Sequence, residues 1–580
     1  MTPNTEQDSV RGLKDRIHNR FELWRDRLSG LDALPQLTVL GLLTGVCAGI
    51  VIVVFRYLVE IPLYFFLPEN TENFEGLSAS AHFWLPFIGA LSLGVVLQLI
   101  DKKHHATSVG HVLDRIRNHQ ARLPLGNFIH QFLGGAWCLI SGQSVGREGP
   151  AVHLGAGCGS LLGQWLRLPN NSLRPLVGCG VAAAIAACFN TPLAGVIFAM
   201  EVVVMEYSII GFIPVILAAV AGSTINQLAF GSDTIFHTPS SAMGSLLELP
   251  FMVLTGLVVA FFAATFIHIQ NFCCRLSLNR PILLRFAIAG IITGCGATLA
   301  PQIMGVGYDT IDGALTGNMG FWLLLSILGI KLLVTGVSLG VGLPGGVIGP
   351  LLFMGACIGG ATGIMANNLM FGTASATGFY VVLGMGAMMG AVLNAPLAAM
   401  MAILELTYNP HIIFPSMLVV VVACLTTRWV FNCEGLFQTL LKTQGKKGAF
   451  LANEQMLSRT GVRSIMEQHI QLCPSTISHE LALSILAQHP KWIVLLDEKL
   501  LVTPSDLTNY LNAQTLKTTS HINLLAIPAK RLDMIELSED TNLYQAITNM
   551  NAANVDAAFI PNLRRLGIIT RMQIDNFYKI

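Results

Sequence analysis

Glu148 is the ionisable residue whose position most strongly suggests chemistry. It stands in the segment Gly146-Arg147-Glu148-Gly149-Pro150, within an apolar stretch of the chain. Glycine permits a tight turn and proline is favoured in the first turn of a helix, so the segment predicts a helix N-terminus. A carboxylate there is either a cap that complements the helix dipole or a functional group, since ionisable residues at membrane depth are functional candidates by default.

A second Gly-x-x-Gly-Pro segment begins at Gly346, with Val347 and Ile348 at its centre. A helix N-terminus presents unpaired N–H groups and the equivalent of about +0.5 charge. Two such ends brought together would bind an anion weakly enough to release it, which conduction requires. Glu148 could compete with that anion for the N–H groups, and its protonation would then couple pH to passage. The matched pair favours this interpretation over two unrelated helix starts.

A second pair of segments indicates an internal duplication. Asn190 opens Asn-Thr-Pro-Leu-Ala and Asn394 opens Asn-Ala-Pro-Leu-Ala, and the same spacing leads from each asparagine to a glutamate, Glu201 or Glu405. Two matched signatures in the same order, at nearly the same offset along the chain, predict two homologous halves. Paired Gly/Pro-interrupted segments mark a transporter site, and the interruptions favour an inverted repeat. The two glutamates are candidates either for function or for partners of backbone helix ends.

The elements that must position these residues are membrane helices. The chain has 580 residues, of which 53% are hydrophobic and 12% are charged, about half the charge of a soluble domain. This composition excludes an ordinary cytosolic enzyme, a disordered protein and a nucleic-acid binder. Ten long apolar runs lie between residues 36 and 433, each about long enough for a ~30 Å hydrocarbon layer. Shorter runs interrupted by Gly and Pro lie between them, at 149–166, 192–206, 347–366 and 396–407.

Charge density divides the chain. Charged residues are sparse across 29–441, whereas 453–580 carry them at more than twice that density, close to the level of a soluble domain. We expect an all-α polytopic membrane core with an inverted repeat and broken, re-entrant helices, followed by a small α/β domain. The expected boundaries are 1–35 for an N-terminal segment, 36–441 for the core (halves about 36–230 and 249–441), 442–454 for a linker and 455–580 for the α/β domain.

Basic residues indicate the orientation. Several arginines and a lysine lie before the first apolar run, and three lysines (Lys442, Lys446 and Lys447) follow the last one. By the positive-inside rule both termini are expected in the cytoplasm. The twelve cysteines show no ligand spacing, so we expect no metal site.

The core resembles the CLC family of chloride channels and chloride/proton antiporters. The segment around Glu148 matches the most specific motif of that family, the segment beginning at Gly346 looks like its second filter motif, and the Asn-x-Pro-Leu-Ala repeats also match. The resemblance implies a homodimer in a bacterial-type inner or plasma membrane, with one chloride pathway per subunit, a gate at Glu148 and no enzymatic activity. The anion-binding residues that it implies are Thr107, Gly146, Arg147, Gly149, Val347, Ile348 and Phe437.

Three departures from the family bear on mechanism. Thr107 replaces the serine of a Gly-Ser-Gly-Ile-Pro segment that here reads Ala-Thr-Ser-Val-Gly, and Phe437 replaces the pathway tyrosine. Val202 stands where antiporters usually carry a second glutamate; valine there is similar to the passive channels and carries no proton. Glu201, Glu206 or a water chain could substitute, with Glu148 and Glu201 as the proton-pathway candidates.

These departures favour passive, channel-like conduction, and a proton-coupled chloride antiporter is the alternative. A remote alternative is a membrane sensor without net transport. A carrier of organic anions would need more cationic side chains in the core than Arg147 and Lys331.

The C-terminal region also repeats. It resembles a pair of CBS domains, in which Thr503 and Asp506 match positions that contact ribose. The second unit keeps Thr570, but Gln573 stands where aspartate is usual. The domain either binds an adenine nucleotide or dimerises without a ligand, and transport itself is expected to need no cofactor.

Overall fold

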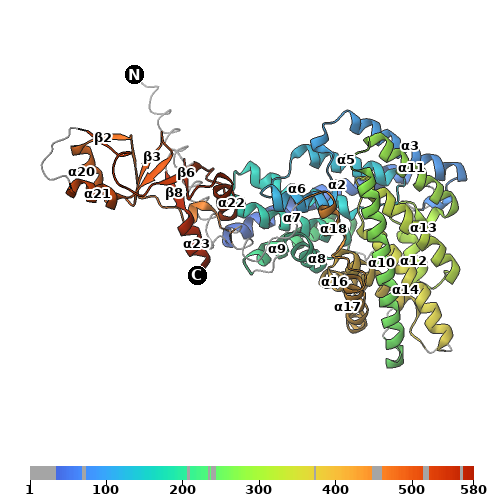
Figure 1. Cartoon of the computed structure of the whole chain (residues 1–580). Coiled ribbons are helices and arrows are strands. Elements are labelled where there is room, and N and C mark those ends of the chain that lie inside the picture. The colour runs from blue at the N-terminus through green and yellow to red at the C-terminus, as the bar shows by residue number, and fades with distance from the viewer. Residues whose placement is uncertain are drawn as a thin grey trace, which may run out of the picture. The chain divides into compact units, whose positions relative to one another are not determined.

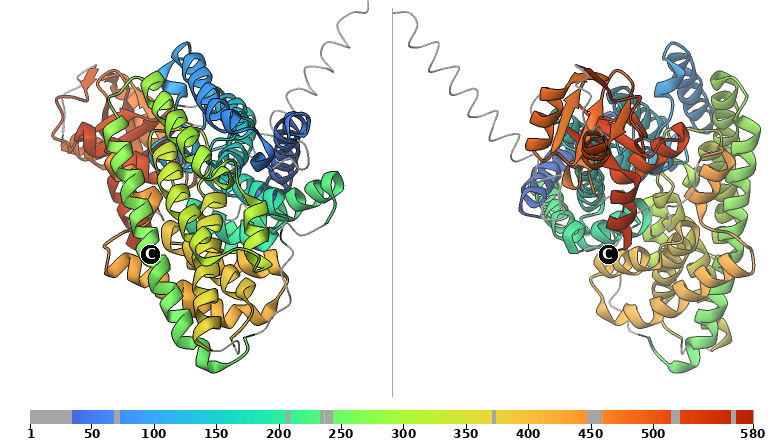
Figure 2. Two further views of the ribbon diagram at one scale, coloured as in Figure 1. Left: turned by 90° about the vertical axis from the view of Figure 1, so that its right-hand side faces the viewer. Right: turned by 60° about the vertical axis from the view of Figure 1, so that its left-hand side comes forward.

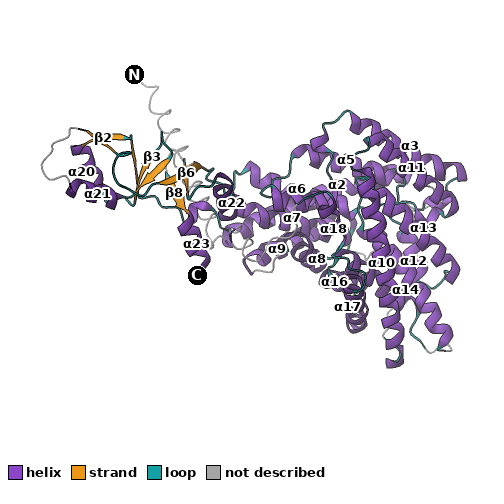
Figure 3. Cartoon of the chain, in the orientation of Figure 1, coloured by secondary structure: helices purple, strands orange, loops and turns teal. Residues whose placement is uncertain are grey.

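The computed structural model describes residues 34–67, 73–205, 209–232, 236, 243–370, 374–446, 457, 460–513, 521–561 and 566–579 (Figure 1). Nearly all of the predicted N-terminal segment, most of the predicted linker and Glu206 therefore lie outside the described residues. The described residues form two units. A helical membrane unit lies within Pro35–Leu166 and Leu173–Ala449, and a smaller α/β unit contains the described part of Phe450–Ile580 (Figure 3).

Within the described residues, nine helices are long and apolar enough to cross a membrane. In the numbering of the helices they are α2 (Leu34–Phe66), α3 (Ala79–Gln98), α7 (Asn170–Phe189), α9 (Ile209–Phe230), α10 (Leu249–Ser277), α11 (Ile282–Leu299), α13 (Phe321–Gly340), α14 (Ile348–Leu369) and α17 (Ile413–Trp429). The long helix α10, green in Figure 2, runs the length of the unit beside α13 and α17. Large apolar side chains such as Phe65 and Trp429 are 80% exposed, as lipid-facing residues are.

Shorter helices lie among these spans. They are α4 (Ser108–Asn118), α5 (Leu125–Ile140), α6 (Glu148–Trp165), α8 (Pro192–Phe198), the π-helix η3 (Ala199–Val204), α12 (Tyr308–Leu315), α15 (Thr377–Leu393), α16 (Pro396–Thr407) and α18 (Leu436–Thr443). The interrupted, re-entrant pieces that the sequence predicts are thus present. Two of the predicted runs, however, are not interrupted: 149–166 forms the continuous helix α6 and 347–366 the continuous helix α14. Their glycines pack against the backbones of α7 and α15 instead of breaking the helices.

The predicted duplication is confirmed by the order of the helices. Helices α4 to α9 recur as α12 to α17, and a nearly constant length of chain separates the starts of α4, α6 and α8 from those of α12, α14 and α16. The same glycine contact recurs in both halves: a Cβ on Gly155 would collide with the carbonyl oxygen of Gly180, and one on Gly355 with that of Gly384. Such close backbone packing requires glycine.

Glu201 and Glu405 each cap a helix of the opposite half. The Glu405 carboxylate accepts hydrogen bonds from the backbone N–H groups of Leu193 and Ala194 at 2.9 and 2.7 Å. The Glu201 carboxylate accepts from Leu397 and Ala398 at 3.3 and 2.7 Å. Both glutamates are therefore partners of backbone helix ends, at the N-termini of α8 and α16. The proton role of Glu201 stays a prediction.

The α/β unit consists of two matching β-α-β-β-α units. The first contains β1 (Ile470–Cys473), α20 (His479–Ala487), β3 (Trp492–Leu495), β4 (Leu500–Val502) and α21 (Pro504–Ala513). The second contains β6 (Leu532–Glu536), α22 (Leu543–Ala553), β7 (Ala557–Ile560), β8 (Gly567–Thr570) and α23 (Arg571–Lys579). The six strands form one sheet in the order β1-β3-β4-β6-β7-β8, while β2 (Thr476–Ser478) and β5 (His521–Asn523) form a separate pair. This arrangement is consistent with the predicted tandem domain.

The reciprocal caps predict a stability effect. Glu405→Ala leaves two N–H groups of α8 without acceptors and should cost about 1–2 kcal/mol, seen as a lower Tm of the purified protein in detergent. Glu201→Ala should cost a similar amount, because the two contacts are equivalent by the repeat. Glu434→Ala is the matched control, since Glu434 pairs with Lys442 at the surface and such pairs contribute little. An unchanged Tm for both cap variants would contradict this account.

Candidate anion pathway

The two Gly-x-x-Gly-Pro segments lie against each other. Gly146 and Gly346 form an antiparallel bridge in which the N–H of each donates to the carbonyl of the other, both at 2.7 Å. A Cβ on Gly149 would collide with the Cα of Gly346, and one on Gly346 with the backbone of Gly149. Equivalent residues that pair with each other are expected where a two-fold axis relates the halves. The N-termini of α6 and α14 therefore begin side by side with no side chain between their backbones.

The Glu148 carboxylate occupies the N-terminus of the opposite helix. Its side chain is fully buried, and Oε2 accepts a hydrogen bond from the backbone N–H of Gly349 at 3.0 Å. Gly349 lies in the first turn of α14, where N–H groups have no partner within the helix. A tethered carboxylate thus takes up a donor of the helix N-terminus that the sequence analysis assigned to an anion, although Gly349 itself was not among the predicted residues.

Tyr308 is the second partner of this carboxylate, and sequence reasoning missed it. Its hydroxyl donates to Glu148 Oε1 at 2.7 Å. Tyr308 opens α12 after Gly307, whose φ of +83° is left-handed and therefore suits glycine. The repeat could have found it, because Tyr308 opens α12 just as Ser108 opens the equivalent helix α4. The Ser108 hydroxyl also crosses between the halves, to the carbonyl of Gly345 at 2.8 Å.

The start of α4 persists although the family's glycine and proline are missing there. Ser108 takes the left-handed φ of +62°, which costs energy in a residue with a side chain. Its N–H donates to Gln131 Oε1 at 2.6 Å, and its hydroxyl is bonded to Gly345 as described. These two bonds hold the turn, and Thr107 directly precedes the helix.

A cavity of about 200 Å³, here called the vestibule, lies on one side of Glu148. Four predicted site residues line it, namely Thr107, Gly149, Val347 and Phe437. Arg285 and Lys446 line it too, and none of the described residues along its wall is a carboxylate. Lys446 is partly neutralised by Asp114 at 2.9 Å. The positive lining suits an anion, and sequence reasoning missed both cationic residues because no motif marks them.

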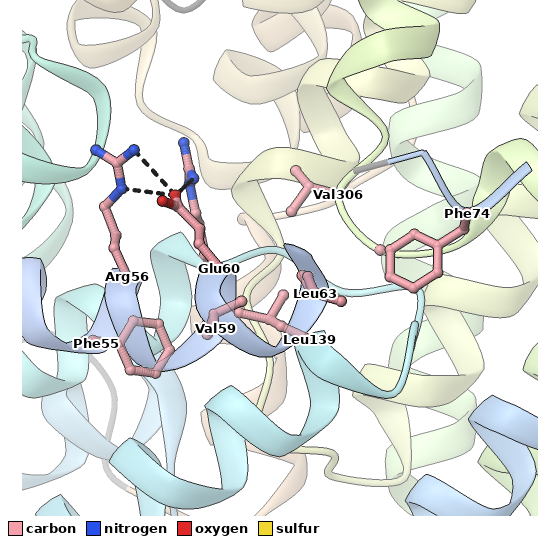
Figure 4. A pocket seen from close by; sticks show the side chains of 10 residues that line it. Phe55, Arg56, Val59, Glu60, Leu63, Phe74, Leu139 and Val306 are labelled. Carbon is pink, nitrogen blue, oxygen red and sulfur yellow. Dashed lines mark hydrogen bonds and ion pairs between the residues drawn. The ribbon is translucent and has the colours of Figure 1, made fainter. Parts of the chain in front are cut away.

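A second cavity of about 40 Å³, here called the small cavity, is lined by Arg147 together with Arg56 and Glu60 of α2 (Figure 4). Arg147 Nη1 lies 3.6 Å from Glu60 Oε1. The residue before Glu148 thus lines the small cavity and the residue after it, Gly149, lines the vestibule, while Glu148 lines neither. The gate candidate therefore lies between two cavities.

The remaining predicted residues of the membrane unit are placed differently. Arg147 is separated from the vestibule residues by Glu148, Gly146 is used in the backbone bridge, and the side chain of Ile348 lines a small apolar pocket. The backbone N–H of Ile348 nevertheless lies at the N-terminus of α14, beside that of Gly349.

Lys331 is fully buried and does not reach a membrane surface. Its Nζ donates to the carbonyls of Ile303 and Gly305 at 2.8 and 3.0 Å. It also lies 4.6 Å from the centre of the Phe353 ring. Lys331 thus fixes the segment that leads into Tyr308.

Val202 is buried in the π-helix η3. Near the end of this π-helix the structure has arginines: Arg174 donates to the carbonyl of Val204 at 3.1 Å, and Arg117 contacts the Met205 sulfur at 2.9 Å. Val202 itself carries no ionisable group, and the charged groups that the structure places near the end of its helix are cations.

In the α/β unit, the side chains predicted to contact a nucleotide form hydrogen bonds with neighbouring side chains at the start of the same helix. Thr503 donates to Asp506 Oδ2 at 2.8 Å, and Thr570 donates to Gln573 Oε1 at 3.1 Å. Within the described residues, no group of three or more His, Cys, Asp or Glu side chains is placed to hold a metal ion.

These features define a membrane transport protein built from two related halves, with facing helix N-termini and a carboxylate between two cavities. A family model described as voltage gated chloride channel matches residues 88–428. The chain belongs to this family, the CLC family, and its members move anions across membranes.

The relatives agree with this assignment. The chain is 33% identical over 296 residues to the putative chloride channel protein ClcB-like of Ralstonia nicotianae, a match that covers 50% of this chain and 68% of the relative. It is 30% identical over 294 residues to the H(+)/Cl(-) exchange transporter ClcA of Vibrio cholerae, covering 49% of this chain and 63% of the exchanger.

Solved structures support the fold. A slow cyanobacterial Cl-/H+ antiporter is similar with a TM-score of 0.60 at 20% identity, covering 71% of this chain and 98% of the antiporter. A eukaryotic CLC transporter is similar with a TM-score of 0.59 at 18% identity, covering 94% of this chain and 99% of the transporter. At these identities the likeness concerns the fold alone.

The cationic lining of the vestibule can be tested at Arg285. Arg285→Gln should reduce chloride flux by about two- to fivefold at low ionic strength, because one charge that attracts anions is lost. The deficit should shrink when an impermeant salt screens the vestibule. Arg275→Gln is the control, since Arg275 is exposed on α10 and does not line the vestibule. Equal flux in the Arg285 variant and the wild type at low salt would refute the role.

Proposed function

We propose that this protein carries chloride through a pathway in which Glu148 is a proton-sensitive gate. The observation that carries the proposal is the position of its carboxylate, bonded to the N-terminus of α14 and to Tyr308 between the two cavities. Ionised, the carboxylate occupies the donors that an anion needs. Protonated, it loses its attraction for them, and chloride takes its place.

Proton-coupled exchange is the leading form of this transport. The sequence alone favours passive conduction because of Val202, but relatives at 30% identity are named H(+)/Cl(-) exchange transporters, which supports coupling. A pair of buried imidazoles lies at the vestibule, but Arg115, whose Nε donates to His111 Nε2 at 3.1 Å, opposes a positive charge there. His111 lines the vestibule, and its Nδ1 lies 2.8 Å from Nε2 of His153, which is fully buried on α6.

Passive conduction is the second candidate. Val202 cannot carry a proton, and Arg117 and Arg174 near the end of its π-helix disfavour a positive charge there. Under this candidate Glu148 still opens the pathway on protonation, but the proton returns to the side from which it came.

Other expectations stay proposals. We place the protein in a bacterial-type inner or plasma membrane with cytoplasmic termini, as a homodimer with one pathway per subunit. The exposed apolar side chains of Leu193 and Leu397, on the mutually capped helices α8 and α16, suit a partner subunit or lipid. An adenine nucleotide at Thr503, Asp506 and Thr570 would have to replace the present bonds of these side chains.

Coupling is measured by reconstituting the protein into liposomes and following chloride and protons together. An inward chloride gradient should drive protons uphill in the opposite direction, because exchange links the two fluxes. Chloride flux without uphill proton movement would select passive conduction, and the absence of chloride flux would refute the proposed function.

The gate is tested with Glu148→Gln and Glu148→Ala. Both variants should conduct chloride with no dependence on pH and without proton movement, since the titrating carboxylate is gone. Glu434→Gln, which removes a surface carboxylate of the same unit, should keep the wild-type pH profile. An unchanged profile in the Glu148 variants would place the gate elsewhere.

A further inference from the structure

A chain of polar side chains connects α2 with Glu148. The Tyr308 hydroxyl donates to Glu148, and the Arg147 guanidinium lies 5.1 Å from the centre of the Tyr308 ring. On its other side, Arg147 lies 3.6 Å from the Glu60 carboxylate. Glu60 therefore acts on the groups that hold the gate without touching the gate itself.

Arg56 is the last side chain in this series of contacts, and residues of α9 hold its guanidinium in place. Its Nε donates to Glu60 Oε1 at 3.1 Å, a contact visible in Figure 4, and its Nη1 donates to Asn226 Oδ1 at 2.9 Å. The guanidinium carbon lies 3.7 Å from the centre of the Phe230 ring. Arg56 and Arg147 thus share one oxygen of Glu60, and the three side chains together carry one net positive charge.

These charges are well shielded from solvent. The side chains of Arg56, Glu60 and Arg147 are 16%, 27% and 13% exposed, so salt screens them less than surface charges. The small cavity that they line has room for a few water molecules. Protons from that side can therefore approach the same groups.

We propose that Arg56, Glu60 and Tyr308 are positioning residues that set the pH at which Glu148 releases the pathway, an inference that rests on the proposed gating role of Glu148. The positive charge of Arg56 favours ionised Glu148, whereas the negative charge of Glu60 opposes it. The Tyr308 hydroxyl favours the ionised form by donating a hydrogen bond.

The other described groups around the carboxylate do not oppose this assignment. Arg147 on α6 acts in the same direction as Arg56, and the Cys188 thiol of α7 interacts with both Arg147 and Glu148 without carrying a charge. From α14 the contact is the backbone N–H of Gly349. Because Arg56 and Glu60 carry opposite charges, their removal should shift the pH dependence in opposite directions. A general loss of packing would not produce that result.

The test is the pH of half-maximal chloride efflux from liposomes, with the same pH on both sides. Glu60→Gln should move this midpoint to more acidic pH, and Arg56→Gln to more alkaline pH, each by on the order of one pH unit. Tyr308→Phe should move it to more alkaline pH. The double variant Arg56→Gln/Glu60→Gln should return close to the wild-type midpoint, because the two charges cancel.

Two controls distinguish an effect of side-chain charge from an effect of side-chain position or of misfolding. Arg56→Lys keeps the charge and should keep a midpoint near that of the wild type, even if Arg56→Gln folds poorly. Glu434→Gln should not move the midpoint. Shifts of the same sign for Arg56→Gln and Glu60→Gln, or no shift, would overturn the inference while wild-type flux still responds to pH. Wild-type flux that does not respond to pH would instead overturn the proposed gate.

Discussion

The constraint on which the rest of the structure depends is the meeting of two helix N-termini in an apolar interior. Their unpaired N–H groups must find acceptors, since no bulk water is present at membrane depth to supply them. The bridge between Gly146 and Gly346 brings the backbones so close that no side chain fits between them. What remains is an acceptor that reaches in from outside the contact, either the tethered Glu148 or a diffusible anion. Anion selectivity is in this sense a property of the backbone.

The same physical solution occurs in a permanent and a removable form. At α8 and α16, Glu405 and Glu201 each bond two successive N–H groups and belong to helices of the opposite half, so these caps hold the halves together. Glu148 instead receives a single backbone donor and one hydroxyl, and glycines flank its helix start. Only one of its two donors belongs to a helix N-terminus, and we therefore expect this cap to be the one that an anion displaces.

Much of the site follows from the sequence because local rules set it. Gly-x-x-Gly-Pro predicts a helix start in each half, and the nearly constant offset between the paired motifs predicts that the two starts are equivalent; both are confirmed. Sequence reasoning missed Tyr308, Arg285 and the pair Arg56–Glu60, because tertiary packing brings them to the site and no sequence motif marks them. Arg147 was assigned with its neighbours to the anion, but successive residues at a helix start point in different directions.

The family fold leaves the coupling of chloride to protons to a few side chains. Under the proposed exchange, a proton must be able to reach Glu148 from the vestibule as well as from the small cavity. Val202 cannot carry a proton, and the arginines near the end of its π-helix raise the cost of a positive charge there. His111 and His153 connect the vestibule with α6, but Arg115 donates to His111 and opposes a positive charge on the pair. Under the proposed function, Glu148 is the gate in both modes. The mode therefore depends on whether a proton crosses this short region more slowly than chloride passes the open gate, a competition between rates that overall fold similarity does not determine.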